Sequence, residues 1–284
     1  MIPSYVALLY VVILCSVNVL GFNMPSRASL RRMSWTLYSE EVGNEASSVV
    51  ADPKDDPIRV AKEGILRLAG GQASEYTVKQ IDLLELQGYI RCLEESTEKI
   101  NDLEGEWELL YTNDDPTRSS PFFSAFRKNV KGIKTPFDPL NNFPEDFGEA
   151  IFKITDNIPI KKIGSVKQYI SNGEIKSEVR VMVNPVGSSL MVTTSAVSPL
   201  EENEQNRVYD VRVIKTEVLD STVAKYIPWL DPASNPNGFP SGAALELTNP
   251  GSSSFQIKMS FNDGHMRVVR SLEDPDSVFL YKKV

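Results

Sequence analysis

The sequence predicts a mainly β protein, an antiparallel β-barrel with a helical brace at its N-terminal side. Apolar residues recur at helical spacing before residue 103 and alternate with polar residues from Glu106 onward. Asn172-Gly173 lies between two alternating runs, which is a strong signal for a β-hairpin. About eight strand-like runs separated by turn residues are typical of a barrel or sandwich. We therefore expect one domain at 58–284, helical over 58–102 and a barrel over 103–284.

The N-terminal 57 residues predict targeting rather than fold. Residues 5–20 form an uncharged, mostly apolar run of about the length of a signal-peptide core, so residues 1–21 are signal-peptide-like. Residues 22–57 form a transit-like segment and linker: arginine and serine are frequent, and no acidic residue occurs before Glu40. This order predicts a bipartite signal and transit sequence for a secondary plastid. Plain secretion and an N-terminal anchor are the alternatives.

Two helices are expected between the linker and the barrel. Ile58, Ala61 and Ile65 recur at helical spacing, and Gly70-Gly71 ends that helix. Ser74 can cap a second helix that runs towards Ile100. Acidic residues interleave with the apolar stripe, which favours helices that brace the barrel over helices that lie on a membrane.

The first strand begins with an informative pattern. Gly105 permits a sharp turn and a close approach of the backbone. Trp107, Leu109 and Tyr111 then share one face if side chains alternate regularly. A large indole just after a glycine predicts a residue that closes the bottom of a small barrel. An ordinary first strand with a core tryptophan is the alternative.

Composition narrows the function classes. The formal charge of −8 disfavours nucleic-acid binding, because phosphates require lysine and arginine neutralisation. After removal of a signal peptide containing Cys15, Cys92 would be alone, so no intrachain disulfide is expected. His265 is the only histidine. With no paired acid and base in the sequence, neither an enzyme nor a cofactor is predicted.

A short aromatic helix is expected after the first strand. Ser120-Pro121 resembles an N-cap followed by proline at the first helical position. Phe122, Phe123 and Phe126 then share a stripe with cationic residues beside it. Such a helix can fold its phenylalanines over the barrel mouth, or it can dip into a lipid interface.

Several of these motifs resemble the plastid-lipid-associated protein (fibrillin) family, which is lipocalin-like. The opening motif is Leu-Glu-Gly-Glu-Trp-Glu-Leu-Leu-Tyr-Thr at 103–112. The closing motif has Asp263, Arg267 and Arg270 at the family's spacing, whereas Phe261-Asn262 departs from the family's Tyr-Leu. Gly264-His265 replaces a pair that is usually acidic in the family, and segments 68–70, 74–93 and 166–173 also resemble it.

The resemblance implies non-enzymatic binding of a lipophilic molecule in a plastid. The candidate ligands are quinones, carotenoids, fatty acids or other lipids, and association with thylakoid or plastoglobule membrane lipid is implied. A structural coat of lipid droplets, with a ligand-free barrel, is the alternative function.

Side-chain chemistry suggests roles for the closing motif and for the barrel interior. An arginine on the last strand can stack on Trp107 and seal one end, while Asp263 can hold that arginine or cap the turn. If the aromatic helix covers the mouth, the expected lining residues are Tyr111, Met182, Met191 and Phe261.

Overall fold

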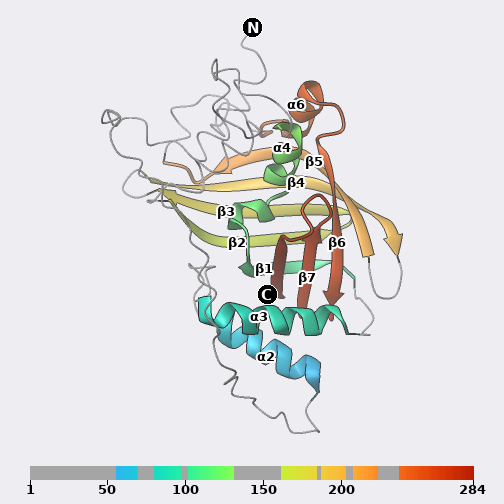
Figure 1. Ribbon diagram of the computed structural model, residues 1–284. Helices are drawn as coiled ribbons and strands as arrows, with labels where there is room; N and C mark the ends of the chain where they lie inside the picture. The colour runs from blue at the N-terminus through green and yellow to red at the C-terminus, as the bar shows by residue number, and fades with distance from the viewer. Residues whose placement is uncertain are drawn as a thin grey trace, which may run out of the picture.

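Eight antiparallel strands close into a barrel in the computed structural model, which describes residues 56–69, 80–96, 102–130, 161–183, 187–202, 207–222 and 237–284 (Figure 1). Each strand pairs with the next along the chain, and β8 pairs with β1. This confirms the predicted mainly β, antiparallel barrel. The strands are β1 (Gly105–Thr112), β2 (Lys161–Ser171), β3 (Glu174–Val183), β4 (Gly187–Glu202), β5 (Arg207–Leu219), β6 (Ser254–Asn262), β7 (Met266–Ser271) and β8 (Val278–Lys283).

The predicted hairpin joins β2 to β3. Asn172 and Gly173 have φ values of 51° and 74°. A two-residue hairpin turn of type I′ requires positive φ at both positions, which asparagine and glycine tolerate best. Ser171 and Glu174 pair directly across the turn. The turn therefore sets the register of the two strands.

Two hydrophobic clusters divide the molecule. The inner core fills the barrel and includes Trp107, Val179 and Met259. The outer core lies between the barrel wall and the N-terminal helices and includes Ile65, Leu86 and Leu280. Side chains of a strand alternate between these two environments, so β1, β7 and β8 are apolar on both faces.

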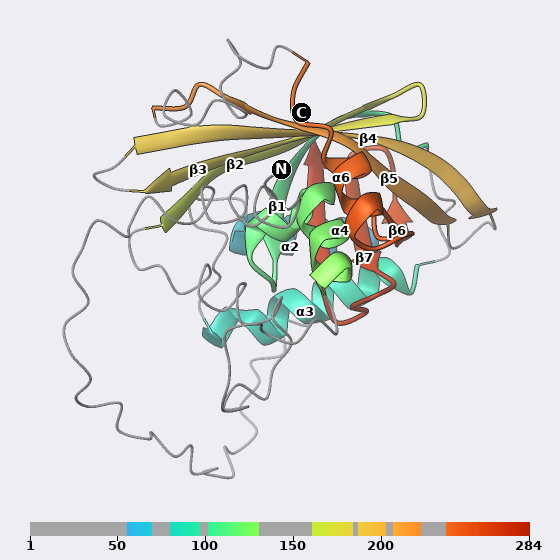
Figure 2. The same cartoon turned by 90° about the horizontal axis from the view of Figure 1, so that it is seen from above.

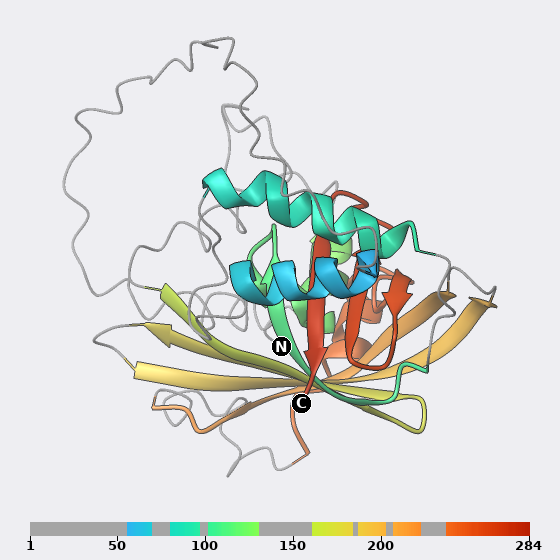
Figure 3. The ribbon, with the colours of Figure 1, turned by 90° about the horizontal axis from the view of Figure 1, so that it is seen from below.

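Helices α2 (Pro57–Ala69) and α3 (Gln80–Glu94) form the outer layer. Figure 3 shows them side by side across the first and last strands of the barrel. Gly64 of α2 allows the close approach, because a Cβ atom there would lie 2.3 Å from the ring of Tyr89. Residues 74–79 and 97–100 of the predicted second helix lie outside the described residues.

Two ion pairs fasten this helical layer to the barrel. Arg270 of β7 donates to Glu94 of α3 through Nε and Nη2, at 2.7 and 2.9 Å. Lys62 of α2 pairs with Asp263 in the β6–β7 turn. Both carboxylates are partly buried, and salt bridges of this kind are screened less than exposed ones.

The pKa values of these carboxylates predict release of the helices in acid. Burial raises the pKa of Glu94, but hydrogen bonds from Arg270 and Ser260 outweigh it and leave the pKa below its usual value of 4.5. Burial likewise raises the pKa of Asp263, and Lys62 with two backbone N–H groups lowers it further than burial raises it. A carboxylate whose pKa is lowered in the folded state stabilises the fold at pH values above its unfolded pKa. This stabilisation is lost as the pH falls through the folded-state pKa.

We therefore expect α2 and α3 to lose hydrogen-exchange protection as the pH falls from 4.5, before the barrel strands do. Hydrogen exchange followed by mass spectrometry from neutral pH to about pH 3 measures this. Glu94→Gln should weaken α3 protection at neutral pH and flatten its pH dependence. Protection of both helices that persists unchanged at the lowest pH would contradict the assignment.

Two further helices lie at the end of the barrel away from α2 and α3. Helix α4 (Pro121–Val130) follows a short 3₁₀ helix, η1 (Pro116–Ser119), and helix α6 (Ser241–Thr248) precedes β6. Seen from above, α4 and α6 lie within the curve of the strands (Figure 2). Among the described helices, none has the length and apolar character needed to cross a membrane.

Candidate ligand-binding site

Helix α4 inserts its aromatic face into the barrel. Asp115 caps η1 by accepting a hydrogen bond from the Thr117 backbone at 2.9 Å, and Pro121 starts α4. Phe122, Phe123 and Phe126 are buried in the inner core, and the Phe122 and Phe126 rings stack at 6.0 Å. A helix folded onto the barrel has this arrangement, whereas a helix dipping into lipid would leave the rings exposed.

The far end of α4 is tied to α6 by one buried amide. Asn129 is fully buried, and its Nδ2 lies 2.9 Å from Leu245 O, 2.6 Å from Thr248 Oγ1 and 2.7 Å from Ser252 Oγ. On the exposed side, Arg127 pairs with Asp274 at 2.9 Å. These bonds fix the position of α4 over the interior.

The opposite end of the barrel is sealed by a cation and two rings. The guanidinium carbon of Arg267 lies 4.6 Å from the ring centroid of Trp107 and 4.3 Å from that of Tyr281. Trp107 is fully buried and donates from Nε1 to Leu103 O at 3.0 Å. The predicted stacking of an arginine on Trp107 is confirmed, with Arg267 as the arginine, although it lies on β7 and not on the last strand.

Gly105 has the turn geometry expected before this tryptophan. Its φ of +135° disfavours any other residue. A Cβ atom there would also lie 2.9 Å from Cε of Lys283 on β8. The glycine thus lets β1 start close to the end of the chain.

Arg267 carries an uncompensated charge. It is 1% exposed, and no acidic residue pairs with it in the described part of the chain. Its Nη2 donates to Gln168 Oε1, while its Nε has no hydrogen-bond partner. Burial lowers the pKa of Arg267 to about 10, so the group still carries its positive charge at neutral pH.

Asp263 and Arg270 do not belong to this seal. Asp263 accepts hydrogen bonds from the backbone N–H groups of His265 and Met266, at 2.9 and 2.8 Å, so it caps the β6–β7 turn. Of the two roles predicted for Asp263, it takes the turn cap and does not hold Arg267. Arg270 points to Glu94 on the outer face, because residues 267 and 270 lie on opposite faces of β7.

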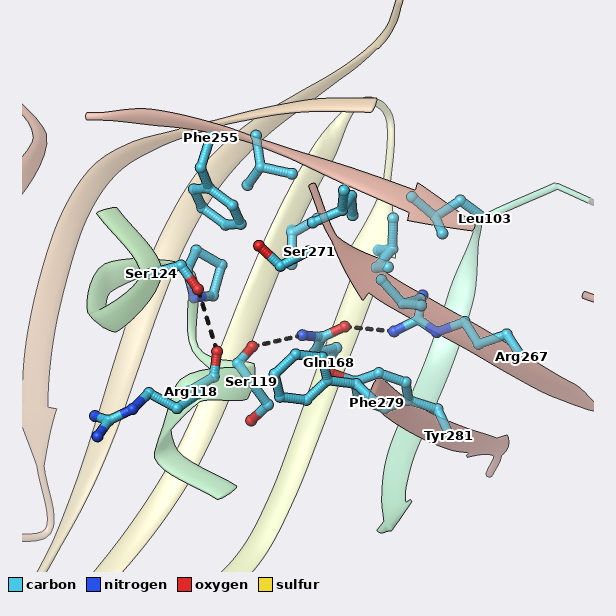
Figure 4. Close-up of a pocket in the computed structure, with 16 residues that line it drawn as sticks. Leu103, Arg118, Ser119, Ser124, Gln168, Phe255, Arg267, Ser271, Phe279 and Tyr281 are labelled. Atoms are coloured by element: carbon cyan, nitrogen blue, oxygen red, sulfur yellow. Dashed lines mark hydrogen bonds between the residues drawn. The ribbon is translucent and has the colours of Figure 1, made fainter. Parts of the chain in front are cut away.

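An inner pocket lies between α4 and the Arg267 end (Figure 4). Its volume is about 40 Å³, enough for roughly two or three water molecules. Gln168 joins its polar wall by donating from Nε2 to Ser119 O at 3.0 Å. The other wall is mostly apolar; the pocket is lined by Leu103, Arg118, Ser119, Pro121, Ser124, Gln168, Ile170, Ile175, Val211, Phe255, Ile257, Arg267, Val269, Ser271, Phe279 and Tyr281.

A larger outer pocket adjoins the inner one. Its volume is about 470 Å³, and charged side chains of both signs line it, including Arg127, Lys128 and Asp274. Four residues line both pockets: Arg118, Ser124, Ser271 and Phe279. The outer pocket is therefore placed as an entrance to the interior beside α4.

The structure corrects the faces assigned to Tyr111 and Phe261. Both lie in the outer core against α2 and α3, and neither lines either pocket. The pairing register shifts between Leu109 and Tyr111 on β1, and between Met259 and Phe261 on β6. A β-bulge inserts one extra residue and reverses the alternation beyond it.

The two methionines predicted to line the interior lie on different faces of the barrel wall. Met191 is buried in the inner core, as predicted for a residue that faces the interior. Met182 is only half-buried and follows Val181, which faces inward, so alternation places Met182 on the outer face. Neither methionine lines the inner pocket, and Phe122, Phe123 and Phe126 do not line it either.

Sequence reasoning missed the polar residues of the pocket. Gln168 stands between inward-facing Val166 and Ile170 on β2 and is 8% exposed. A single polar residue at an inward position of an alternating strand was the available signal. Tyr281 gives a weaker signal, since a tyrosine on a closing strand is common; burial raises its pKa to about 12.

Comparison of the chain with models of protein families, with curated proteins and with solved structures finds no match.

Proposed function

We propose that this chain is a non-enzymatic plastid protein that binds a lipophilic molecule inside its barrel. The observation that carries the proposal is the largely apolar inner pocket, which adjoins a larger outer pocket and is covered by α4. Barrels of about eight strands can hold one small ligand. The ligand classes proposed are quinones, carotenoids, fatty acids or other lipids, as the resemblance to fibrillins implies.

Binding requires α4 to move. Ligand sites for small molecules usually occupy about 300–1,000 Å³, far more than the inner pocket offers. The phenylalanines of α4 occupy the adjoining volume, and Pro121 and Ser124 of α4 line the pocket itself. Withdrawal of α4 would join the inner pocket to the outer pocket of about 470 Å³.

The proposed function is binding, without catalysis by the site residues. His265 is exposed in the β6–β7 turn, on the outside of the barrel. Within the described ranges, no three histidine, cysteine or acidic side chains gather in a group that could hold a metal ion. The proposed partners are a lipophilic molecule and a thylakoid or plastoglobule surface, with no nucleic acid.

The plastid location rests on residues 1–57, most of which lie outside the described residues. We expect a fluorescent fusion of residues 1–57 to reach the plastid, and replacement of Phe22 to divert it along the secretory route. Fluorescence imaging in an alga with a secondary plastid measures both. Cytosolic fluorescence from the intact fusion would contradict the assignment.

A lipid-droplet coat with a ligand-free barrel is the second candidate. The small inner pocket favours it, because α4 already fills the interior. A coat also needs exposed apolar area. The large exposed apolar side chains of the described residues come from different segments, for example Leu84 of α3 and Leu247 of α6.

Titration of the full chain with Nile red, a neutral lipophilic dye, tests the proposed function. We expect saturable fluorescence enhancement with one site per chain, reversed by oleyl alcohol. A coat without an interior site would give no saturable, competable signal in the absence of vesicles.

The role of α4 can be tested through its tie to α6. Asn129→Ala removes the amide that bonds to Leu245, Thr248 and Ser252, so α4 should withdraw more readily. Loss of a buried hydrogen-bonding group costs about 1–3 kcal/mol, which predicts dye uptake about tenfold faster in stopped-flow fluorescence. The matched control is Asn113→Ala, since Asn113 bonds to Asp276 and Val278 and does not touch α4. Equal rates in both variants would show that α4 is not the gate.

A further inference from the structure

The buried guanidinium of Arg267 has an N–H donor for which the protein supplies no hydrogen-bond acceptor. Arg267 lines the inner pocket, and its Nε–H has no acceptor. Its Nη2 donates a hydrogen bond to Gln168, a neutral amide. Figure 4 shows Arg267 extending from its strand towards Gln168 along the pocket wall.

The physical chemistry of this group favours an anionic partner. Burial of an unpaired charge is strongly unfavourable, and a charge in a protein interior is normally paired. Contact with the rings of Trp107 and Tyr281 offsets part of the penalty. The ring contacts and the bond from Nη2 to Gln168 leave Nε–H available to an oxygen acceptor.

The single buried cation indicates how many negative charges the anion carries. One buried cation is neutralised by one negative charge, and the described lining of the inner pocket holds no carboxylate. Arg118, the other cation of that lining, lies beside the outer pocket, where Asp114 is 3.9 Å from it. A monoanion therefore fits the inner end better than a dianion.

The apolar part of the pocket indicates that such a ligand has a hydrocarbon tail. Ile170, Ile175, Val211 and Phe255 make up much of the wall beyond Arg267. Apolar burial of a hydrocarbon chain on that wall contributes about 0.8 kcal/mol per methylene group. The site thus combines one cation with an apolar channel that leads towards α4.

We propose that Arg267 binds the carboxylate of a single-chain lipid, such as a fatty acid, with the hydrocarbon chain along this apolar wall. This inference rests on the proposed function and specifies its ligand. The carboxylate accepts a hydrogen bond from Nε–H of Arg267. Gln168 is a positioning residue: its amide is fixed by Ser119 O and holds Nη2 of the arginine.

Displacement of Nile red from the full chain tests the head group. Oleate should displace the dye, and methyl oleate, which has the same chain without the charge, should bind about 10- to 100-fold more weakly. Dodecyl phosphate and dodecanoate compare a phosphate with a carboxylate at equal chain length, and dodecanoate should bind more tightly. Equal binding of oleate and its ester, or tighter binding of the phosphate, would overturn the proposal.

Two arginine variants locate the interaction. Arg267→Gln should weaken oleate about 10- to 100-fold and leave methyl oleate unchanged. The matched control, Arg212→Gln, removes an exposed arginine between two inward-facing residues of β5 and should leave both ligands unchanged. Loss of oleate discrimination in both variants would reduce the effect to net charge and overturn the assignment.

A measurement on the unaltered chain holds even if Arg267→Gln does not fold. A nearby cation lowers the pKa of a carboxylate. The ¹³C resonance of carboxyl-labelled oleate should therefore titrate at lower pH when bound to the protein than in a phospholipid bilayer. Titration at the bilayer pH would overturn the proposal. If Nile red itself does not bind, the proposed function fails; if it binds but oleate and methyl oleate compete equally, only this inference fails.

Discussion

Trp107→Ala should destabilise the barrel by about 3–5 kcal/mol, the range for removing a large aromatic side chain from a packed core. Trp107 is completely buried, so its removal leaves a large cavity at the sealed end. The change also removes one of the two rings over Arg267 and leaves Leu103 O without the indole donor. The cavity and the weakened cation–π contact act in the same direction.

Urea unfolding of the full chain, followed by circular dichroism, measures the change in free energy of unfolding. Trp107→Phe is the matched control: it keeps an aromatic face over Arg267 and loses only the Nε1 donor and part of the volume. It should cost less than half as much as Trp107→Ala. Similar small losses in both variants would contradict a seal built on the indole.

Phe122→Ala should also lower stability by about 3–5 kcal/mol, because Phe122 is fully buried in the inner core. The ring packs edge-on against Phe123 at 5.4 Å and stacks on Phe126. Phe122→Leu, which retains most of the apolar volume, should cost about 1.5 kcal/mol or less if the site can adjust around it.

This comparison separates the two sequence-based interpretations of α4. A helix packed in the barrel loses stability in solution when Phe122 is truncated. A helix that inserts into lipid instead loses vesicle binding and keeps its free energy of unfolding. Unchanged stability with weakened binding to vesicles of galactolipid would contradict the packing of α4 inside the barrel.

The strands were predictable because two local signals agree along most of the chain. Alternation of apolar and polar residues marks β3, and Asn172-Gly173 fixes its start. Barrel closure was predictable as well, and it pairs β1 with β8. The Trp107–Arg267 contact reaches further, since Arg267 lies on β7 and its side chain meets the indole past the intervening β8.

The failures come from features that a single sequence does not mark. The bulges at Leu109/Tyr111 and Met259/Phe261 reverse the faces of later residues without a glycine to signal them. Helix α6 was not predicted, because its eight residues carry only a weak amphipathic pattern and depend on packing against α4 and β5. The role of Gln168 depends on Arg267, which is 99 residues away in the sequence and comes beside it only in the folded barrel.

Lipid analysis of the protein purified from its native compartment tests the central claim most directly. Native mass spectrometry of the intact chain should show one lipophilic molecule per chain, and organic extraction should then identify it. We expect a single dominant lipid at close to equimolar amount. Ligand-free chain from lipid-rich native membranes, with no lipid gained on incubation with a plastid lipid extract, would contradict a binding function and favour the droplet coat.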